Sequence, residues 1–207
     1  MPRATNSNSK QHPKDDDISH EEVVARIIEA FQAYGFDGAS LTKISEATGL
    51  IKASLYWRFP SGKEAMADAA LKAVGEHFAK YVLKPVDEPG PLYERIAKIA
   101  ERLREFYGNG KKECLLDTLT FAGSPPRIRK HAKRTFEFWE SKFQALALES
   151  GLGAAAARRA AQDAIAGLEG GLVLARVTGD VQAFRRATDS LGRWLAPDVV
   201  VANGGSD

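Results

Sequence analysis

The sequence predicts an all-α protein, with a small helical unit at the amino end and a larger helical unit after it. Apolar residues recur at intervals of three and four positions through most of the 207 residues, which is the period of an amphipathic helix. Serine residues that can cap helices stand at the start of several segments, and glycine or proline stands where they end. We therefore expect a series of short and long helices.

The composition is that of an ordinary globular protein, with 44% apolar residues, enough for one sizeable core and a smaller satellite. The formal charge of +2 means that any basic surface must be local. Cys114 is the only cysteine, so no intrachain disulfide can form. No apolar run approaches the ~20 residues of a membrane-spanning helix and no secretion signal is recognisable, so we expect a cytoplasmic protein without a membrane partner.

The first helix is expected to follow a flexible tail, residues 1–17, which has no large apolar side chain except Met1. Ser19 and Glu22 have the spacing of a capping box, and Ile18 can reach Val23 as a hydrophobic staple. Gly35 ends this helix. Its predicted apolar face consists of Val23, Val24, Ile27, Phe31 and Tyr34.

Two short helices follow, with a turn between them. Ser40 is the predicted N-cap of a helix over residues 41–48, which turns Leu41, Ile44 and Ala47 inward. Gly49 supplies the turn, and Pro60 limits the next helix to about seven residues after Ile51. Two short helices joined by a glycine-containing turn form a helix-turn-helix.

The second of these helices is too small to bury its large side chains. At about 100° per residue, Ile51, Leu55 and Phe59 share the inward face, so Ala53 and Trp57 must point away from the core. Ser54 and Tyr56 flank them, and Lys52 and Arg58 stand at the edges of the buried stripe. The alternative is that Trp57 packs on a neighbouring domain and that the charged residues are simply solvated.

These residue types suit a recognition helix in the major groove of DNA. Lys52 and Arg58 can donate to guanine or to phosphates, Ser54 can contact base edges or the backbone, and the small Ala53 allows a close approach. Tyr56 and Trp57 offer polar tips to phosphates and apolar bodies to thymine methyl groups. Downstream, Ser61 and Glu64 have capping-box spacing, and the helix start beside Lys63 is a predicted phosphate site.

Residues 18–66 resemble the DNA-binding domain of the TetR family of bacterial transcriptional regulators. The resemblance rests on a capped helix ending in "YGFDGAS", then "LTKISEATG", then "LIKASLYWRFPSGKEAM". Ile51 departs from it, because many members have a capping serine there, and Gly62 lengthens the loop before Lys63. By this resemblance the residues that face DNA are Thr42, Lys43, Lys52, Ala53, Ser54, Tyr56, Trp57, Arg58 and Lys63.

The remaining chain is expected to be helical as well. A connecting helix, residues 67–84, leads to "KPVDEPGP", which marks the junction to a domain over residues 85–197, and residues 198–207 form a flexible tail. Further helices are predicted over residues 92–106 and 115–121, from Pro126 to Gly151, and over residues 154–178 and 180–195. The expected fold is thus a three-helix DNA-binding domain and a larger ligand-binding and dimerisation domain.

The larger domain carries two candidate surfaces. Its aromatic residues are usually core, but the resemblance implies a cavity for a small apolar inducer, and our candidates are Phe121, Phe136, Trp139 and Phe143. Glycine residues 167, 170 and 171 indicate close helix packing. For a two-fold homodimer interface the candidates are Ile165, Leu168, Leu172, Phe184, Leu191 and Trp194, although they can instead complete the core of one chain.

The resemblance implies a repressor that an inducer releases from a palindromic double-stranded operator. An alternative is a thiol-based repressor that senses oxidants or electrophiles, because "KKECLLDTL" resembles a segment of such members, and Lys111 and Lys112 could lower the pKa of Cys114. The histidines and Cys114 have no metal-ligand spacing and no phosphate-binding loop accompanies them. We therefore expect no enzyme, no catalytic residue, no metal and no cofactor.

Overall fold

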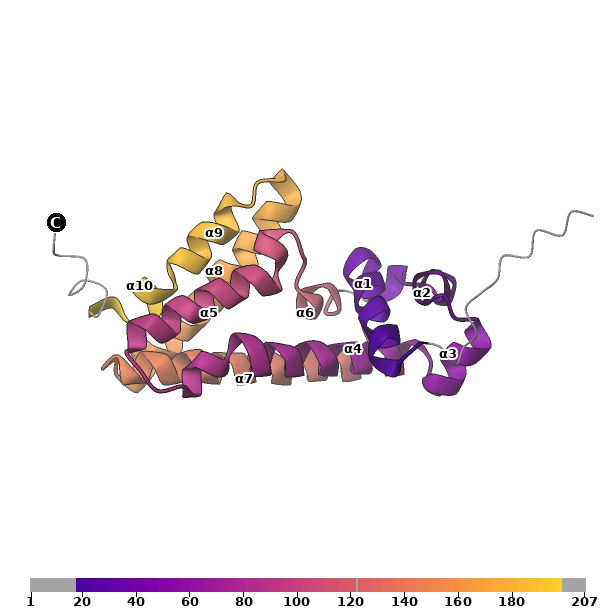
Figure 1. Ribbon diagram of the computed structural model, residues 1–207, viewed down its shortest axis with the longest axis horizontal. Helices are drawn as coiled ribbons and strands as arrows, with labels where there is room; N and C mark the ends of the chain where they lie inside the picture. The colour runs from indigo at the N-terminus through magenta and orange to yellow at the C-terminus, as the bar shows by residue number, and fades with distance from the viewer. Residues whose placement is uncertain (1–17, 122, 199–207) are drawn as a thin grey trace, which may run out of the picture.

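The computed structural model describes residues 18–121 and 123–198, and within these ranges every regular element is a helix (Figure 1). No helix in these ranges is both long and apolar enough to cross a membrane. The tail predicted over residues 1–17 and nearly all of that predicted from residue 198 lie outside the described residues. The helices are α1 (His20–Gly38), α2 (Leu41–Thr48), α3 (Lys52–Arg58), α4 (Lys63–His77), α5 (Leu92–Phe106), α6 (Leu115–Thr118), α7 (Pro126–Glu149), α8 (Ala154–Thr178), α9 (Gln182–Asp189) and α10 (Leu191–Leu195), with a π-helical turn η1 (Phe78–Val82) and the 3-10 turns η2 (Lys84–Asp87) and η3 (Gly108–Gly110).

The first helix begins where the sequence predicts, and its regular geometry breaks at Gly35, the predicted end. The Ser19 hydroxyl accepts a hydrogen bond from the Glu22 backbone N–H at 3.1 Å, but the Glu22 carboxylate accepts from Arg26 at 2.6 Å, so only half of the capping box forms. Gly35 has a φ of +64°, which ends regular helix geometry there. Tyr34, predicted to be inward, is exposed, and the Lys43 ammonium lies 3.8 Å from its ring centre.

The helix-turn-helix forms, with two corrections to its inward face. Ala47 is exposed, and Thr48 is buried in its place, its hydroxyl donating to the Ile44 carbonyl at 2.7 Å. Ile51 is 55% exposed, although it was predicted to face inward. It is the N-cap of α3 and has an extended backbone, so the angle of 100° per residue within a helix does not predict where its side chain points. Leu50 and Leu55 fill the core on either side of it.

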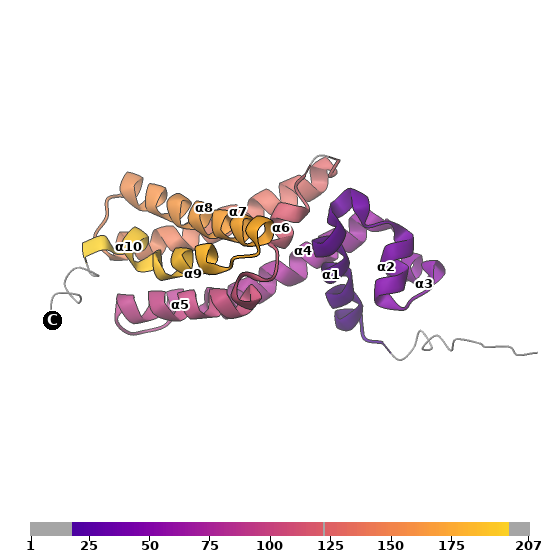
Figure 2. The ribbon, with the colours of Figure 1, turned by 90° about the horizontal axis from the view of Figure 1, so that it is seen from above.

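The fourth helix starts one residue later than a capping box at Ser61 requires. Gly62 is the N-cap, with a φ of +64°, and no side chain caps the helix, so the predicted pairing of Ser61 with Glu64 is wrong. The helix then runs into η1, and its apolar side is buried from Met66 through Phe78 to Val82. This continuous rod connects the helix-turn-helix end of the molecule to the larger helical body (Figures 1 and 2).

The helices of the larger body follow the prediction with two differences. α8 has the predicted bounds, whereas α6 ends at Thr118, and the last predicted helix is divided into α9 and α10 at Ser190. α8 and α9 lie side by side in both ribbon views. Glycine makes this approach possible, because a Cβ at residue 171 would lie 2.7 Å from the Phe184 Cα, and one at residue 167 would collide with the Trp194 ring. The expectation of close packing is therefore confirmed at Gly167 and Gly171. It is wrong for Gly170, because no other described helix comes within 4 Å of a Cβ added there.

Candidate nucleic-acid interface and ligand cleft

The outer face of α3 is the most exposed aromatic surface of the N-terminal unit. Trp57 is 81% exposed and Tyr56 is 47% exposed. Leu55, on the opposite side of α3, is fully buried. Lys52 and Ala53 are exposed on the same short helix. α3 lies at the end of the molecule farthest from α8 to α10 (Figure 1). No described neighbouring element covers Trp57, so within this chain the alternative of packing on a second domain is not realised.

Four of the nine predicted DNA-facing residues are half-buried, and two of these hold the unit together. Arg58 donates to the Ile18 carbonyl at 3.2 Å. Lys63 donates to the Phe36 carbonyl at 2.8 Å, and its ammonium lies 4.5 Å from the Phe36 ring centre. These two contacts tie α3 and α4 to both ends of α1. The half-buried residues are Lys43, Ser54, Arg58 and Lys63, and the exposed ones are Thr42, Lys52, Ala53, Tyr56 and Trp57.

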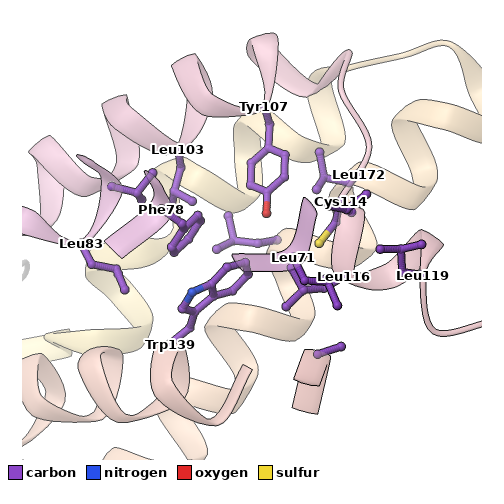
Figure 3. Close-up of a cluster of buried hydrophobic side chains, with 14 of the residues drawn as sticks. Leu71, Phe78, Leu83, Leu103, Tyr107, Cys114, Leu116, Leu119, Trp139 and Leu172 are labelled. Atoms are coloured by element: carbon purple, nitrogen blue, oxygen red, sulfur yellow. The ribbon is translucent and has the colours of Figure 1, made fainter. Parts of the chain in front are cut away.

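A cleft of about 1230 Å³ lies between α1, α4 and the start of α6. One wall comes from α1, where the apolar Val24 and Ile28 alternate with polar residues such as Glu29 and Gln32. The inner end of the cleft reaches Trp139, Tyr107 and Cys114. Figure 3 shows these last three side chains reaching from α7, the end of α5 and the start of α6 toward Leu71. Trp139 stacks on Phe78 at 3.8 Å between ring centres, and its indole N–H has no hydrogen-bond partner among the described residues.

Only Trp139 of the four predicted pocket residues lines this cleft. Phe121 is 53% exposed, Phe136 is half-buried and Phe143 is buried in the core. The periodicity of α7 identifies its inward face, but it does not reveal where facing helices leave space. Tyr107 was missed because it stands after the last apolar position of the predicted helix, directly before the glycine-rich "GNG".

A buried polar cluster stands behind the inner end of the cleft. Cys114 lies beside Tyr107 and Glu169, and burial is the main cause that raises the pKa of both Cys114 and Tyr107 well above their ordinary values. Burial also raises the pKa of Glu169 from 4.5 to about 7. The expectation that Lys111 and Lys112 lower the pKa of Cys114 is therefore wrong, because burial and the Glu169 carboxylate act in the opposite direction. This thiol is protonated at neutral pH, which does not favour an oxidant sensor.

Most residues predicted for the dimer interface lie inside the single chain. Phe184 and Leu191 are fully buried, and Leu168 and Leu172 are nearly so, whereas Ile165 and Trp194 are half-buried. These side chains complete the core, which is the alternative that the sequence left open. The outward face of α8 instead exposes Val173, Leu174 and Val177, the last at 75%. Within residues 18–121 and 123–198, no cluster of three potential metal ligands occurs.

Two sequence families match the chain, one at each end. Residues 23–70 match the family described as bacterial regulatory proteins, tetR family, and residues 93–190 match the transcriptional regulator LmrA/YxaF-like C-terminal domain. Among curated proteins, the chain is 26% identical over 167 residues to the uncharacterized HTH-type transcriptional regulator YxaF of Bacillus subtilis (strain 168), covering 78% of this chain and 87% of that protein. It is also 26% identical over 161 residues to the HTH-type transcriptional regulator LmrA of the same organism, covering 75% and 85%.

Solved structures share the fold over nearly their whole length. A TetR transcriptional regulator from Legionella pneumophila superposes with a TM-score of 0.77 at 23% identity, covering 86% of this chain and 99% of that chain. The regulatory protein TetR from Rhodobacter sphaeroides gives a TM-score of 0.74 at 19% identity, covering 84% and 97%. Both units of the chain are therefore similar to regulators of one kind.

Proposed function

Since the chain belongs to the TetR family of bacterial regulatory proteins, we propose that it is a repressor that binds a palindromic operator as a homodimer and that a small apolar ligand releases it. Membership makes the chain a DNA-binding transcriptional regulator and not an enzyme. Our proposal adds that the chain represses transcription, that it forms a homodimer, that an inducer releases it, and which residues perform each task.

The exposed face of α3 is the observation that carries the DNA-binding part of the proposal. Trp57 is 81% exposed, so the chain gives up the stabilisation that burying this large side chain would provide. Such an exposed apolar side chain is typical of a surface that binds a partner. Lys52 and Ala53 share this exposure. In our proposal α3 enters the major groove, Tyr56 and Lys52 contact phosphates or bases, and Trp57 packs against a thymine methyl group or the sugar-phosphate backbone.

Lys63 and Arg58 have a second task in this proposal. Their bonds to the Phe36 and Ile18 carbonyls fix the angle between α1, α3 and α4 in the free protein. Each side chain has further donors, because an ammonium has three N–H groups and a guanidinium five. We propose that both keep their carbonyl contacts and turn remaining donors to phosphates, so that they position α3 as well as bind DNA.

Homodimerisation is proposed to use the outward face of α8. Gly170 belongs to this face, and among the described residues no atom outside its own stretch of α8 lies within 4 Å of the place where its Cβ would be. Val173 and Val177 follow it at three- and four-residue spacing and are exposed. A second copy related by a two-fold axis can cover this apolar strip with the same strip. Two copies of α3 then read both halves of an inverted repeat and add their binding energies.

The cleft is the proposed inducer site. Its wall on α1 belongs to the helix that supports α2 and α3, and its inner end belongs to the larger body. The side-chain amide of Gln32 donates to the Glu113 carbonyl at 2.8 Å across this boundary, and both residues line the cleft. An apolar ligand that fills the space between them changes how α1 rests on the larger body, and with it the spacing of the two recognition helices.

Selection of binding sites from a random double-stranded library tests this proposal directly. The parent protein is expected to enrich an inverted repeat, and a Tyr56→Ala, Trp57→Ala variant is expected to lose the enrichment. The matched control is Tyr93→Ala, which removes an equally exposed tyrosine from α5. The salt concentration is held near 150 mM, because phosphate contacts make the affinity strongly salt-dependent.

Two results would contradict the proposal. An enriched site without two-fold symmetry would contradict the palindromic homodimer. Enrichment that survives in the Tyr56→Ala, Trp57→Ala variant would remove α3 from the contact surface. Once an operator is known, ligands are screened by release of the protein from it. If no apolar compound or extract weakens the binding of the protein to its operator, induction through the cleft is contradicted as well.

A further inference from the structure

The start of α7 carries a dense group of basic residues that the contacts described so far do not use. No acidic residue lies between Asp117 and Glu137 in the sequence. The basic residues in this stretch are exposed on the first turns of α7, and we refer to them as the α7 basic start. They are Arg127, Arg129, Lys130, Lys133 and Arg134.

Only part of this charge is neutralised within the chain. Arg127 pairs with Asp68 at 2.5 Å, and Lys133 lies 3.6 Å from Glu137, both with well-exposed basic side chains. Arg129 donates to the Ser124 carbonyl. For Lys130 and Arg134, the described part of the chain offers no ion pair. The surface therefore keeps an excess of positive charge although the whole chain has a formal charge of only +2.

The α7 basic start and the loop before it contact α4 and the end of α1. Asp68, the partner of Arg127 and His131, is five residues after Lys63, the first residue of α4, which is about 7.5 Å along the helix axis. The loop before α7 also touches the end of α1, because a Cβ at Gly123 would collide with the carboxylate of Asp37. Asp37 is three residues before Ser40, the N-cap of α2. In both ribbon views the start of α7 lies beside α4 and α1 (Figures 1 and 2).

From this arrangement we propose that the α7 basic start is a second contact surface for operator DNA, one that binds backbone phosphates and reads no bases. It rests on the DNA binding of the proposed function, not on the palindrome or the inducer. An extended polyanion suits exposed cations that are spread over two helical turns. In this proposal the cations beside α1 and α4 contact phosphates that flank the bases under α3. Direct contact is needed, because salt screens exposed charges beyond about 8 Å at physiological ionic strength.

The test compares two double variants that lose the same charge. Lys130→Gln with Arg134→Gln removes two cations of the α7 basic start, and Lys84→Gln with Lys98→Gln removes two exposed cations from η2 and α5. Glutamine keeps a helix propensity close to that of lysine and arginine. The affinity for an operator duplex is measured by fluorescence anisotropy over a series of KCl concentrations. Thermal unfolding, followed by circular dichroism, checks that both variants fold like the parent.

We expect the slope of log affinity against log salt to become shallower by about one for each phosphate contact removed, so by about two per chain in the α7 variant. The control is expected to keep the slope of the parent. A slope equal in both variants would overturn the proposal and leave an acidic protein partner or a solvated surface as the role of these residues. If the parent selects no operator, the same series is run on a non-specific duplex, because phosphate contacts do not depend on sequence.

Discussion

Replacing Gly171 by alanine should destabilise the protein, whereas the same change at the neighbouring Gly170 should not. The three atoms nearest to a Cβ at residue 171 all belong to the backbone of α9, with the Phe184 Cα at 2.7 Å, the Phe184 nitrogen at 3.1 Å and the Ala183 carbonyl oxygen at 3.2 Å. Backbone cannot turn aside as a flexible side chain can. At residue 170 no described atom outside its own stretch of α8 lies within 4 Å of the added carbon.

The magnitudes follow from two opposing terms. Alanine favours a helix over glycine by about 1 kcal/mol, and this gain applies at both positions. Overpacking a tight contact costs about 1 to 3 kcal/mol, and this cost applies only at residue 171. The two variants should therefore differ by about 1 to 3 kcal/mol, which corresponds to about 2 to 12 °C in Tm for a chain of this size.

Thermal and urea unfolding, followed by circular dichroism at one protein concentration, measures this difference. Because Gly170 lies on the proposed dimer face, the molecular mass of each variant is determined by sedimentation under the same conditions. Equal stability of the two variants at the same oligomeric state would refute the claim that glycine lets α8 and α9 approach so closely.

Three further outcomes follow from the described contacts. Burial raises the pKa of Glu169 from 4.5 to about 7, so the stability that its protonated form contributes is present at low pH and is lost as the pH rises through 7. Glutamine does not titrate. The free energy of unfolding of Glu169→Gln, measured in urea, should therefore gain roughly 2 kcal/mol over that of the parent between pH 5 and pH 8. Val177→Arg places a charge on the outward face of α8 and should yield monomers in sedimentation, whereas Leu148→Arg, at an exposed site on α7, should not. A dimeric Val177→Arg protein would exclude the outward face of α8 as the interface. Iodoacetamide should modify Cys114 slowly until urea unfolds the chain, and Cys114→Ser should respond to oxidants as the parent does; rapid labelling of the folded protein would contradict the burial of the thiol.

Local chemistry made the N-terminal unit predictable from its sequence. Ser40 caps α2 through a hydrogen bond from the Lys43 N–H at 3.3 Å, and Pro60 follows directly after the C-cap of α3. Such signals depend on a few neighbouring residues, so a single sequence is enough to interpret them. The same holds for the bounds of α8, which starts after Gly153 and ends at Gly179.

The errors arose where the answer depends on packing between distant segments. Ile51 was assigned to a buried face because its position in the helix was counted without knowing that it is the extended N-cap. Phe184 and Leu191 were assigned to a partner because the pattern shows that they are apolar but not which surface covers them. The cleft combines Val24 and Trp139, more than a hundred residues apart, and no local pattern relates them.

The position of the cleft limits what an inducer must do. A ligand shifts an equilibrium only as far as its affinities for the two states differ. A compound that fits the cleft equally well in the free and DNA-bound proteins would bind without releasing the operator. An inducer of the proposed kind must therefore favour a separation of Gln32 from Glu113, or a position of Trp139 against Phe78, that differs from the one in the DNA-bound protein. By linkage, the operator must weaken the binding of that ligand by the factor by which the ligand weakens the binding of DNA.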